Sequence, residues 1–223
     1  TAAAAGQSWL GLPTEPARAL GVFCEDPRDE LMRRQQRIFD NMQIQWGDLQ
    51  RGELGLHSRV GLDNILMSFD RFEDKGTPTD VYQALHNTCQ EWDADLIVLD
   101  ALHDLFGGNE NIRPQARQFI QLLHQLAADT EATVVLLAHP SQAGINTGSG
   151  QSGSTAWNNA VRSRLYLTRP PSEGDEPDDP DARTLKRMKA NYGPTGDSLP
   201  LRYQGGVFVP DKPDTGAVAG IER

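Results

Sequence analysis

The chain has 223 residues, of which 38% are hydrophobic, and its 31 acidic side chains against 21 lysines and arginines give a net charge of -10. This length allows one sizeable α/β core or two small domains, and the acidity excludes a protein that coats nucleic acid through a generally basic surface. No apolar run approaches the roughly 18 residues of a membrane span. Cys24 and Cys89 are too few for a disulfide framework, so we expect a reducing, cytoplasmic setting.

The first third of the chain opens with an alanine run closed by Gly6, a pattern typical of the last turns of a helix and its C-cap. Short apolar runs predict buried strands, and a thin apolar stripe among Arg and Gln predicts a surface helix. We therefore expect a strand at 19–24, a surface helix at 29–42, no regular period at 43–62, a strand at 64–69 and a polar loop at 70–79.

The middle of the chain alternates amphipathic helices with near-continuous apolar strands. Helical spacing is clear at 80–92 and 114–129, and the apolar runs at 95–100 and 133–138 predict buried strands. Apolar strands separated by amphipathic helices are typical of a parallel sheet that is covered on both faces. The fold class predicted here is therefore α/β.

After His139 the composition changes to Gly, Ser and charged residues. We expect a mobile loop at 140–155, a short helix at 157–161, strands at 164–168 and 184–189, an acidic hairpin tip at 172–181, and a strand pair at 199–209 that turns at Gly205-Gly206. This predicts a C-terminal antiparallel hairpin extension. As domain organisation we expect a single domain at 1–209 and a loose tail at 210–223.

Polar side chains stand at the ends of three predicted strands. Glu25 and Asp100 each follow an apolar run, and His139 follows a third. Ligands of open parallel sheets bind at the carboxyl ends of the strands, where such groups converge. An Asp in this position is suited to hold Mg²⁺ beside a nucleotide phosphate, and a Glu nearby can orient the attacking water. An alternative use of Asp100 and His139, together with Asp104, is a metal-dependent hydrolase.

The combination of these motifs resembles the RepA-like group of AAA-family ATPases, which are RecA-like P-loop proteins related to the hexameric replicative helicases. The resemblance spans about residues 6–210. The stretches that match are Phe23-Cys-Glu-Asp26, Leu96-Ile-Val-Leu-Asp100, Leu136-Leu-Ala-His139, Ser152-Gly-Ser-Thr-Ala-Trp-Asn-Asn-Ala-Val-Arg162 and Lys189-Ala-Asn-Tyr-Gly193. A RecA-like parallel sheet is the fold that the resemblance implies.

The resemblance also implies roles for single residues. Glu25 would be the general base, Asp100 the Walker B acid that holds Mg²⁺, and His139 a sensor of the phosphate state. Arg162 matches an arginine finger that reaches a neighbouring subunit's nucleotide, and Lys189 lies in a hairpin that faces the same phosphates. Residues of the matching stretches expected at the nucleotide are Asp26, Asn191 and Tyr192.

The partners implied are ATP with Mg²⁺, single-stranded DNA and further copies of the chain in a ring, with a hexamer expected. The Gly/Ser stretch after His139 stands where the family places a DNA-facing channel loop, although no Lys or Arg occurs from Ser141 to Asn159. Position 191, where the helicases carry an Arg, holds Asn191.

One departure concerns the phosphate-binding loop G-x-x-x-x-G-K-[ST], which is absent from the 223 residues. In the family this loop precedes a helix that would end near the alanine run, so we expect the chain to begin just after it. Because the loop's N–H groups and Lys hold the phosphates, we expect this polypeptide alone to bind ATP poorly and to hydrolyse little. An alternative function is a non-catalytic DNA-binding or helicase-loading module with the same fold.

Overall fold

A computed structural model describes residues 1–49, 54–70, 75–170 and 179–211. The helices are α1 (Ala2–Ala5), α2 (Arg28–Met42), the 3₁₀ turn η1 (Trp46–Asp48), α3 (Asp80–Glu91), α4 (Leu102–Leu105), α5 (Arg113–Thr130), α6 (Gln142–Asn146) and α7 (Thr155–Ala160). The strands are β1 (Ala19–Phe23), β2 (Leu54–Ser58), β3 (Met67–Phe69), β4 (Gly76–Pro78), β5 (Leu96–Asp100), β6 (Phe106–Gly107), β7 (Thr133–Leu136), β8 (Ser163–Thr168), β9 (Ala182–Ala190), β10 (Ser198–Gln204) and β11 (Val207–Pro210).

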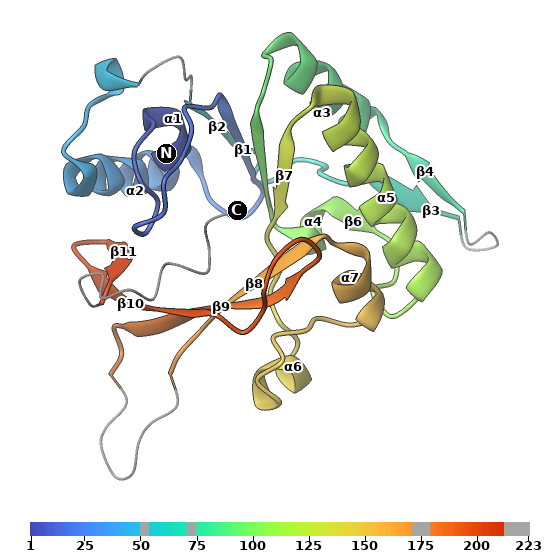
Figure 1. Cartoon of the computed structure of the whole chain (residues 1–223). Coiled ribbons are helices and arrows are strands. Elements are labelled where there is room, and N and C mark those ends of the chain that lie inside the picture. Colours follow the sequence, from blue (N-terminus) through green and yellow to red (C-terminus); the bar gives the residue numbers. More distant parts are fainter. Residues whose placement is uncertain (50–53, 71–74, 171–178, 212–223) are drawn as a thin grey trace.

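The central sheet has the strand order β2-β1-β5-β7, and every pairing in it is parallel. β1 and β5 are the apolar runs that the sequence marks as strands, and their side chains are largely buried. Helices α1 and α2 lie on one side of this sheet, whereas α3 and α5 lie on the other (Figure 1). The predicted α/β fold, with a parallel sheet between helices, is confirmed.

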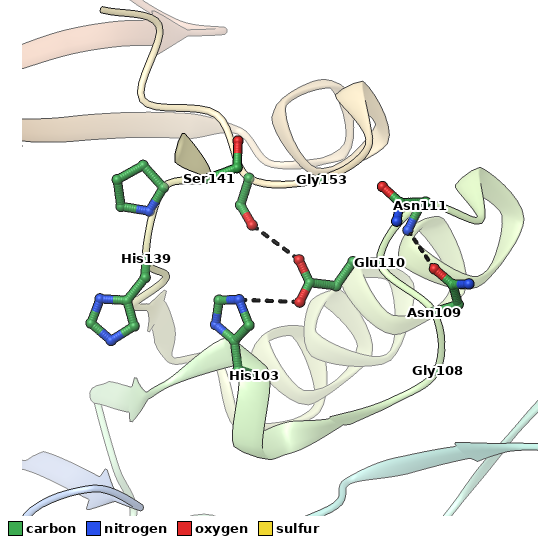
Figure 2. A pocket seen from close by; sticks show the side chains of 10 residues that line it. His103, Gly108, Asn109, Glu110, Asn111, His139, Ser141 and Gly153 are labelled. Carbon is green, nitrogen blue, oxygen red and sulfur yellow. Dashed lines mark hydrogen bonds and ion pairs between the residues drawn. The ribbon is translucent and has the colours of Figure 1, made fainter. Parts of the chain in front are cut away.

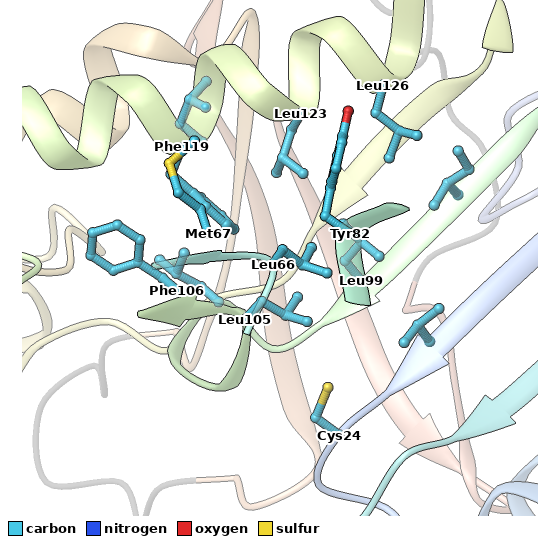
Figure 3. Packing of buried hydrophobic residues seen from close by; sticks show 14 of the residues in the cluster. Cys24, Leu66, Met67, Tyr82, Leu99, Leu105, Phe106, Phe119, Leu123 and Leu126 are labelled. Atoms are coloured by element: carbon cyan, nitrogen blue, oxygen red, sulfur yellow. The ribbon is translucent and has the colours of Figure 1, made fainter. Parts of the chain in front are cut away.

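The main core lies between the sheet and the α3–α5 side, because α5 presents a wide apolar stripe to the strands. Phe119 of α5 is fully buried and lies close to Phe106 (Figure 3), with 5.3 Å between the ring centroids in an edge-to-face contact. The ring of Trp157 meets Phe119 edge to face at 6.1 Å. Trp157 thereby anchors α7 on the core, as its place in a short predicted helix suggests. Such edge-on aromatic contacts stabilise the cluster beyond the area that they bury.

The C-terminal region forms a second, antiparallel sheet with the order β11-β10-β9-β8. The predicted hairpin extension is therefore confirmed and is larger than one hairpin. Gly205 and Gly206 make the tight turn between β10 and β11 with φ of 62° and 92°, conformations that a side chain disfavours. In Figure 1 this sheet extends below the central one and carries β11 toward α2.

Four predictions of secondary structure are wrong in whole or in part. The stretch 43–62 contains β2, an edge strand of the central sheet, and the loop expected at 70–79 contains β4. The strand expected at 64–69 is only β3, which pairs with β4 and β6 in a separate three-stranded sheet. The Gly/Ser stretch contains α6. These elements are short or half-buried, so they show too little apolar period to be recognised.

Two expectations fall largely outside the described residues: the acidic tip at 172–181, of which 172–178 are not described, and the tail, from residue 212 on. β11 runs to Pro210, and the Asp211 N–H donates to Pro200 O at 3.0 Å. Within the described ranges, no helix has both the length and the apolar character needed to cross a membrane.

Candidate functional site

The carboxyl ends of β1 and β5 bring two of the predicted residues together. In the parallel register of these strands Phe23 lies opposite Asp100, and the Cys24 N–H donates to Asp100 O at 2.6 Å. Glu25 therefore follows directly on the residue that is bonded to Asp100. The apolar residues of both strands are fixed in the core, so the sheet positions these two carboxylates side by side at its edge.

His139 joins the two carboxylates from the segment that follows β7. β7 ends at Leu136, three residues earlier, so His139 lies beyond the strand and does not end it. The ladder continues for one residue, because the Leu137 N–H donates to Leu99 O at 2.9 Å. His139 Nε2 lies 3.4 Å from Glu25 Oε2, and both side chains are about half exposed. A contact of this length between exposed groups orients the side chains but stabilises the fold little.

The electrostatics of the site centre on Asp100. Burial raises the pKa of its carboxyl, and the negative charges of Glu25 and Asp26 raise it further, while His139 and Arg34 act in the opposite direction. Asp26 is itself paired with Arg34 of α2. The charges of Glu25 and Asp26 thus act on a partly buried carboxyl, and a cation bound beside Asp100 would offset them.

The metal-hydrolase alternative requires Asp100, Asp104 and His139 to act as a ligand set. Within the part of the chain that the structure describes, no group of three or more His, Cys, Asp or Glu is placed to hold a metal ion, so these three do not form one. Cys24 lies beside the site, but burial and the neighbouring carboxylates raise the pKa of its thiol to about 11. That thiol is therefore protonated at neutral pH and is a poor nucleophile.

The remaining predicted residues form a second group, where α7 meets β8 and β9. Lys189 Nζ donates to the carbonyl oxygens of Asn158, Asn159 and Val161 at 2.8–2.9 Å, so its ammonium closes the C-terminal end of α7. Arg162 is exposed, and its carbonyl accepts the Asn191 N–H at 3.0 Å.

Tyr192 projects from this second group with 83% of its surface open. Among the described residues, no hydrogen bond or ion pair joins the second group to Glu25, Asp100 or His139. The structure therefore divides the predicted site residues into two sets.

The Gly/Ser segment, residues 141–154, makes more contacts with the rest of the protein than a mobile loop, which its composition predicts, would make. Ser141 caps α6, and Gly144 lies so close to Gln151 that a Cβ there would overlap the Gln151 carbonyl. Arg164 Nη1 donates to Ser149 O and Gly150 O at 2.9 and 3.1 Å. Arg164, on the strand that follows, thus holds the segment through its carbonyls, and burial lowers the pKa of its guanidinium.

A cavity of about 600 Å³ opens between this segment and the loop after β6 (Figure 2). Glu110 lies at its centre and contacts His103 and Ser152, and His139 lines the same cavity. Sequence reasoning missed Glu110. The only signal for it is the polar, Gly-containing run Gly107-Gly-Asn-Glu-Asn111 directly after an apolar stretch.

Comparisons with known proteins show the family of this chain and support its fold. Residues 1–144, more than half of the chain, match the family described as AAA domain, so the chain belongs to that family. The crystal structure of the RadB recombinase superposes with a TM-score of 0.57 at 13% identity, covering 88% of this chain and 80% of that one. A second solved structure, an ATPase domain, gives 0.58 at 14% identity, covering 87% and 75%. At such identities the likeness concerns the fold, which is RecA-like as predicted.

Proposed function

We propose that this protein is the motor domain of a RepA-like replication ATPase or helicase of a phage or plasmid, which couples hydrolysis of the ATP γ-phosphate to single-stranded DNA. The observation that carries the proposal is the pair Glu25 and Asp100 at the ends of adjacent parallel strands, with His139 Nε2 3.4 Å from Glu25. Membership of the AAA domain family and the RecA-like fold support it.

In this proposal Glu25 accepts a proton from the water that attacks the γ-phosphate. Its carboxylate is half exposed, so a water can reach it, and His139 restrains it from one side. A positioned base of this kind contributes about 10²–10⁴ in rate. His139 contacts Glu25 and lines the cavity, which supports a role as the sensor of phosphate cleavage.

Mg²⁺ fits Asp100 as a single protein ligand: burial and the negative charges of Glu25 and Asp26 raise the pKa of its carboxyl, and a bound cation would offset those charges. Magnesium commonly uses one or two protein carboxylates and completes its shell with water and substrate phosphates. When bound, the ion neutralises charge on the phosphates. Asp100 would hold it, with Asp26 and Glu25 supplying further negative potential.

The second group supports a role across a subunit boundary in a ring, for which we propose a hexamer. Arg162 and Tyr192 are exposed, as residues that reach into a neighbouring nucleotide must be. Lys189 is engaged with three carbonyls, so it would reach a neighbour's phosphates only by leaving α7. We infer that docking on α7 is the state of Lys189 when no nucleotide faces it, and that Asn191 lies beside the same phosphates.

DNA contact is assigned to the Gly/Ser segment through backbone N–H groups and hydroxyls, which bind phosphate without a formal charge. The lack of Lys and Arg in 141–159 makes weak DNA affinity the expectation. Cys24 and Cys89 are buried free thiols, which agrees with action in the cytoplasm.

The test is Mg-ATP turnover with and without single-stranded DNA. Because the 223 residues contain no G-x-x-x-x-G-K-[ST], turnover by the chain alone should be near background, so the assay includes a version extended upstream by such a loop. In the extended version we expect stimulation by DNA, and Glu25→Gln should lower turnover at least 100-fold while ATP still binds. Glu91→Gln, an exposed change at the end of α3, is the matched control.

A non-catalytic binding module gives a different result in the same assay. DNA would bind, no turnover would appear in the extended version, and Glu25→Gln would change nothing. Such an outcome would replace the motor assignment with the DNA-binding or helicase-loading alternative.

A further inference from the structure

The carboxylate of Glu110 bridges two parts of the molecule that are distant in sequence. Oε1 lies 3.1 Å from His103 Nε2, and Oε2 accepts a hydrogen bond from Ser152 Oγ at 3.0 Å (Figure 2). The Glu110 side chain is 28% exposed, so much of it is shielded from water. Each carboxylate oxygen thus has its own partner, and the two partners lie on opposite sides of the cavity.

On one side, the bridge leads to the candidate active site. His103 belongs to α4, which begins two residues after Asp100, and the Leu102 N–H donates to Leu137 O at 2.8 Å. The His103 ring lies 6.0 Å from the ring of His139, which in turn contacts Glu25. A displacement of His139 or of the end of β5 therefore acts on His103, the first partner of Glu110.

On the other side, Glu110 fits closely against the Gly/Ser segment. The Ser154 N–H donates to Glu110 O at 3.2 Å. A Cβ on Gly153, whose φ is +50°, would lie 3.1 Å from the Glu110 Cβ, tighter than an ordinary contact. Both the side chain and the backbone of Glu110 thus hold the end of the segment, and the glycine allows this approach.

We propose that Glu110 is the positioning residue that couples the conformation of the Gly/Ser segment to the active site through His103. Loss of the His103 contact frees one carboxylate oxygen, shifts the carboxylate and weakens its bond to Ser152. Partly shielded hydrogen bonds that share one group influence each other in this way. If the proposed function is correct, this coupling makes DNA contact depend on the phosphate state of the nucleotide. That purpose rests on the proposed function. The coupling itself does not depend on that function.

The test is hydrogen–deuterium exchange of peptides covering 141–154 in the whole chain without nucleotide. Glu110→Ala and Ser152→Ala should each raise amide exchange there about fivefold, the effect of one lost hydrogen bond, and the double variant no further. Glu91→Ala, which removes a carboxylate from an exposed helix end, should leave the segment unchanged.

The deciding variant is His103→Ala. It should raise exchange in the segment, although His103 does not touch the segment in the described contacts, and it should add nothing in the Glu110→Ala background. His103→Gln, which retains an N–H donor near the position of Nε2, should restore protection. If Glu110→Ala unfolds the chain, Ser152→Ala serves as the second background, because it removes the same bond from the other end.

The proposal is overturned if His103→Ala leaves the segment unchanged, if it acts equally with and without Glu110, or if His103→Gln fails to restore protection. A Glu110 that merely holds the segment would give the first of these results. None of these measurements uses ATP, so an inactive motor in the turnover assay would reject the proposed function without deciding the coupling.

Discussion

The two larger sheets of this protein are held in place by different kinds of contact. The parallel sheet is part of an apolar core in which Ile97, Leu99 and Phe119 are fully buried. In the antiparallel sheet, among the described residues, only Tyr166, Leu201 and Val207 are buried hydrophobics. Its other fixed points are charged: Arg187 with Asp197, Arg202 with Asp179 and Asp211, and Lys189 with α7.

This difference indicates that the parallel sheet holds residues in fixed positions, whereas the antiparallel sheet can move more easily. Apolar burial is non-directional and large, so the parallel sheet fixes Glu25 and Asp100 rigidly. Polar contacts replace contacts with water at a small net free energy, so the antiparallel sheet can shift at lower cost than the parallel sheet. The residues proposed to act on a neighbouring subunit, Arg162 and Lys189, lie in the part held by polar contacts.

The largest expected effect is in the apolar core. Phe119→Ala removes a ring that contacts Phe106 and Trp157, and should lower the free energy of unfolding by about 3–5 kcal/mol. Leu167→Ala, on β8 and 44% exposed, should cost less than about 1 kcal/mol. Urea unfolding measures both, and similar losses at the two sites would contradict the comparison.

The second effect concerns the polar anchor of α7. Lys189→Met keeps an unbranched side chain one atom shorter but removes three hydrogen bonds to carbonyls, and should cost about 2–3 kcal/mol. Lys186→Met, on the same strand, is the matched control and should stay within about 0.5 kcal/mol. Amide exchange in 155–161 should rise only for Lys189→Met. Unchanged exchange there would mean that Lys189 does not hold α7 in solution.

The contrast between apolar burial and polar contacts also decides which elements can be predicted from the sequence. The strands β1, β5 and β7 and the helices α3 and α5 carry long apolar patterns, which predict them to within a few residues. β2 is missed because a glycine interrupts a half-buried edge strand, and β4 because it is a three-residue strand that ends in Pro78. α6 is missed because a capping serine and close glycine contacts build it, with little apolar content.

The candidate site divides in the same way. Glu25 and Asp100 are predictable because each follows an apolar strand, and strand ends converge in a parallel sheet. The contact of Glu110 with Ser152, and those of Arg164 with the Gly/Ser segment, join residues 14–42 positions apart without any spacing rule. Lys189 bonds to backbone carbonyls, which have no signature in the sequence.

A third prediction concerns the turn that closes the antiparallel sheet next to α2. A Cβ on Gly206, at φ 92°, would overlap Cδ of Arg37, whereas Gly205, at φ 62°, has open space around it. Gly206→Ala should therefore cost about 2 kcal/mol and Gly205→Ala about 1 kcal/mol. Thermal unfolding measures both losses, and equal losses would show that the exposed Arg37 side chain moves away from the added methyl group.

The smallest expected effect is a gain in the free energy of unfolding, where the other variants lose stability. It comes from a substitution at the candidate site. Burial and the charges of Glu25 and Asp26 raise the pKa of Asp100, so its carboxylate opposes folding at neutral pH. Asp100→Asn removes that charge and should raise the free energy of unfolding by about 0.5–1 kcal/mol, allowing for screening by water at a partly exposed group. Asp40→Asn, on exposed α2 surface where Asn can still accept from Gln36, should change little.

The dependence on pH checks the cause of that gain. A carboxyl whose pKa is raised in the folded state lowers stability once it is ionised, and this penalty disappears as the pH falls through the raised pKa. The advantage of Asp100→Asn should therefore be full at pH 7 and shrink toward acid pH, while turnover of the extended version is lost at every pH. A variant that is less stable than the wild type at pH 7 would show that Asp100 has a structural role. If Asp100→Asn is more stable than the wild type but inactive, stability cannot be the reason for an aspartate at the end of β5.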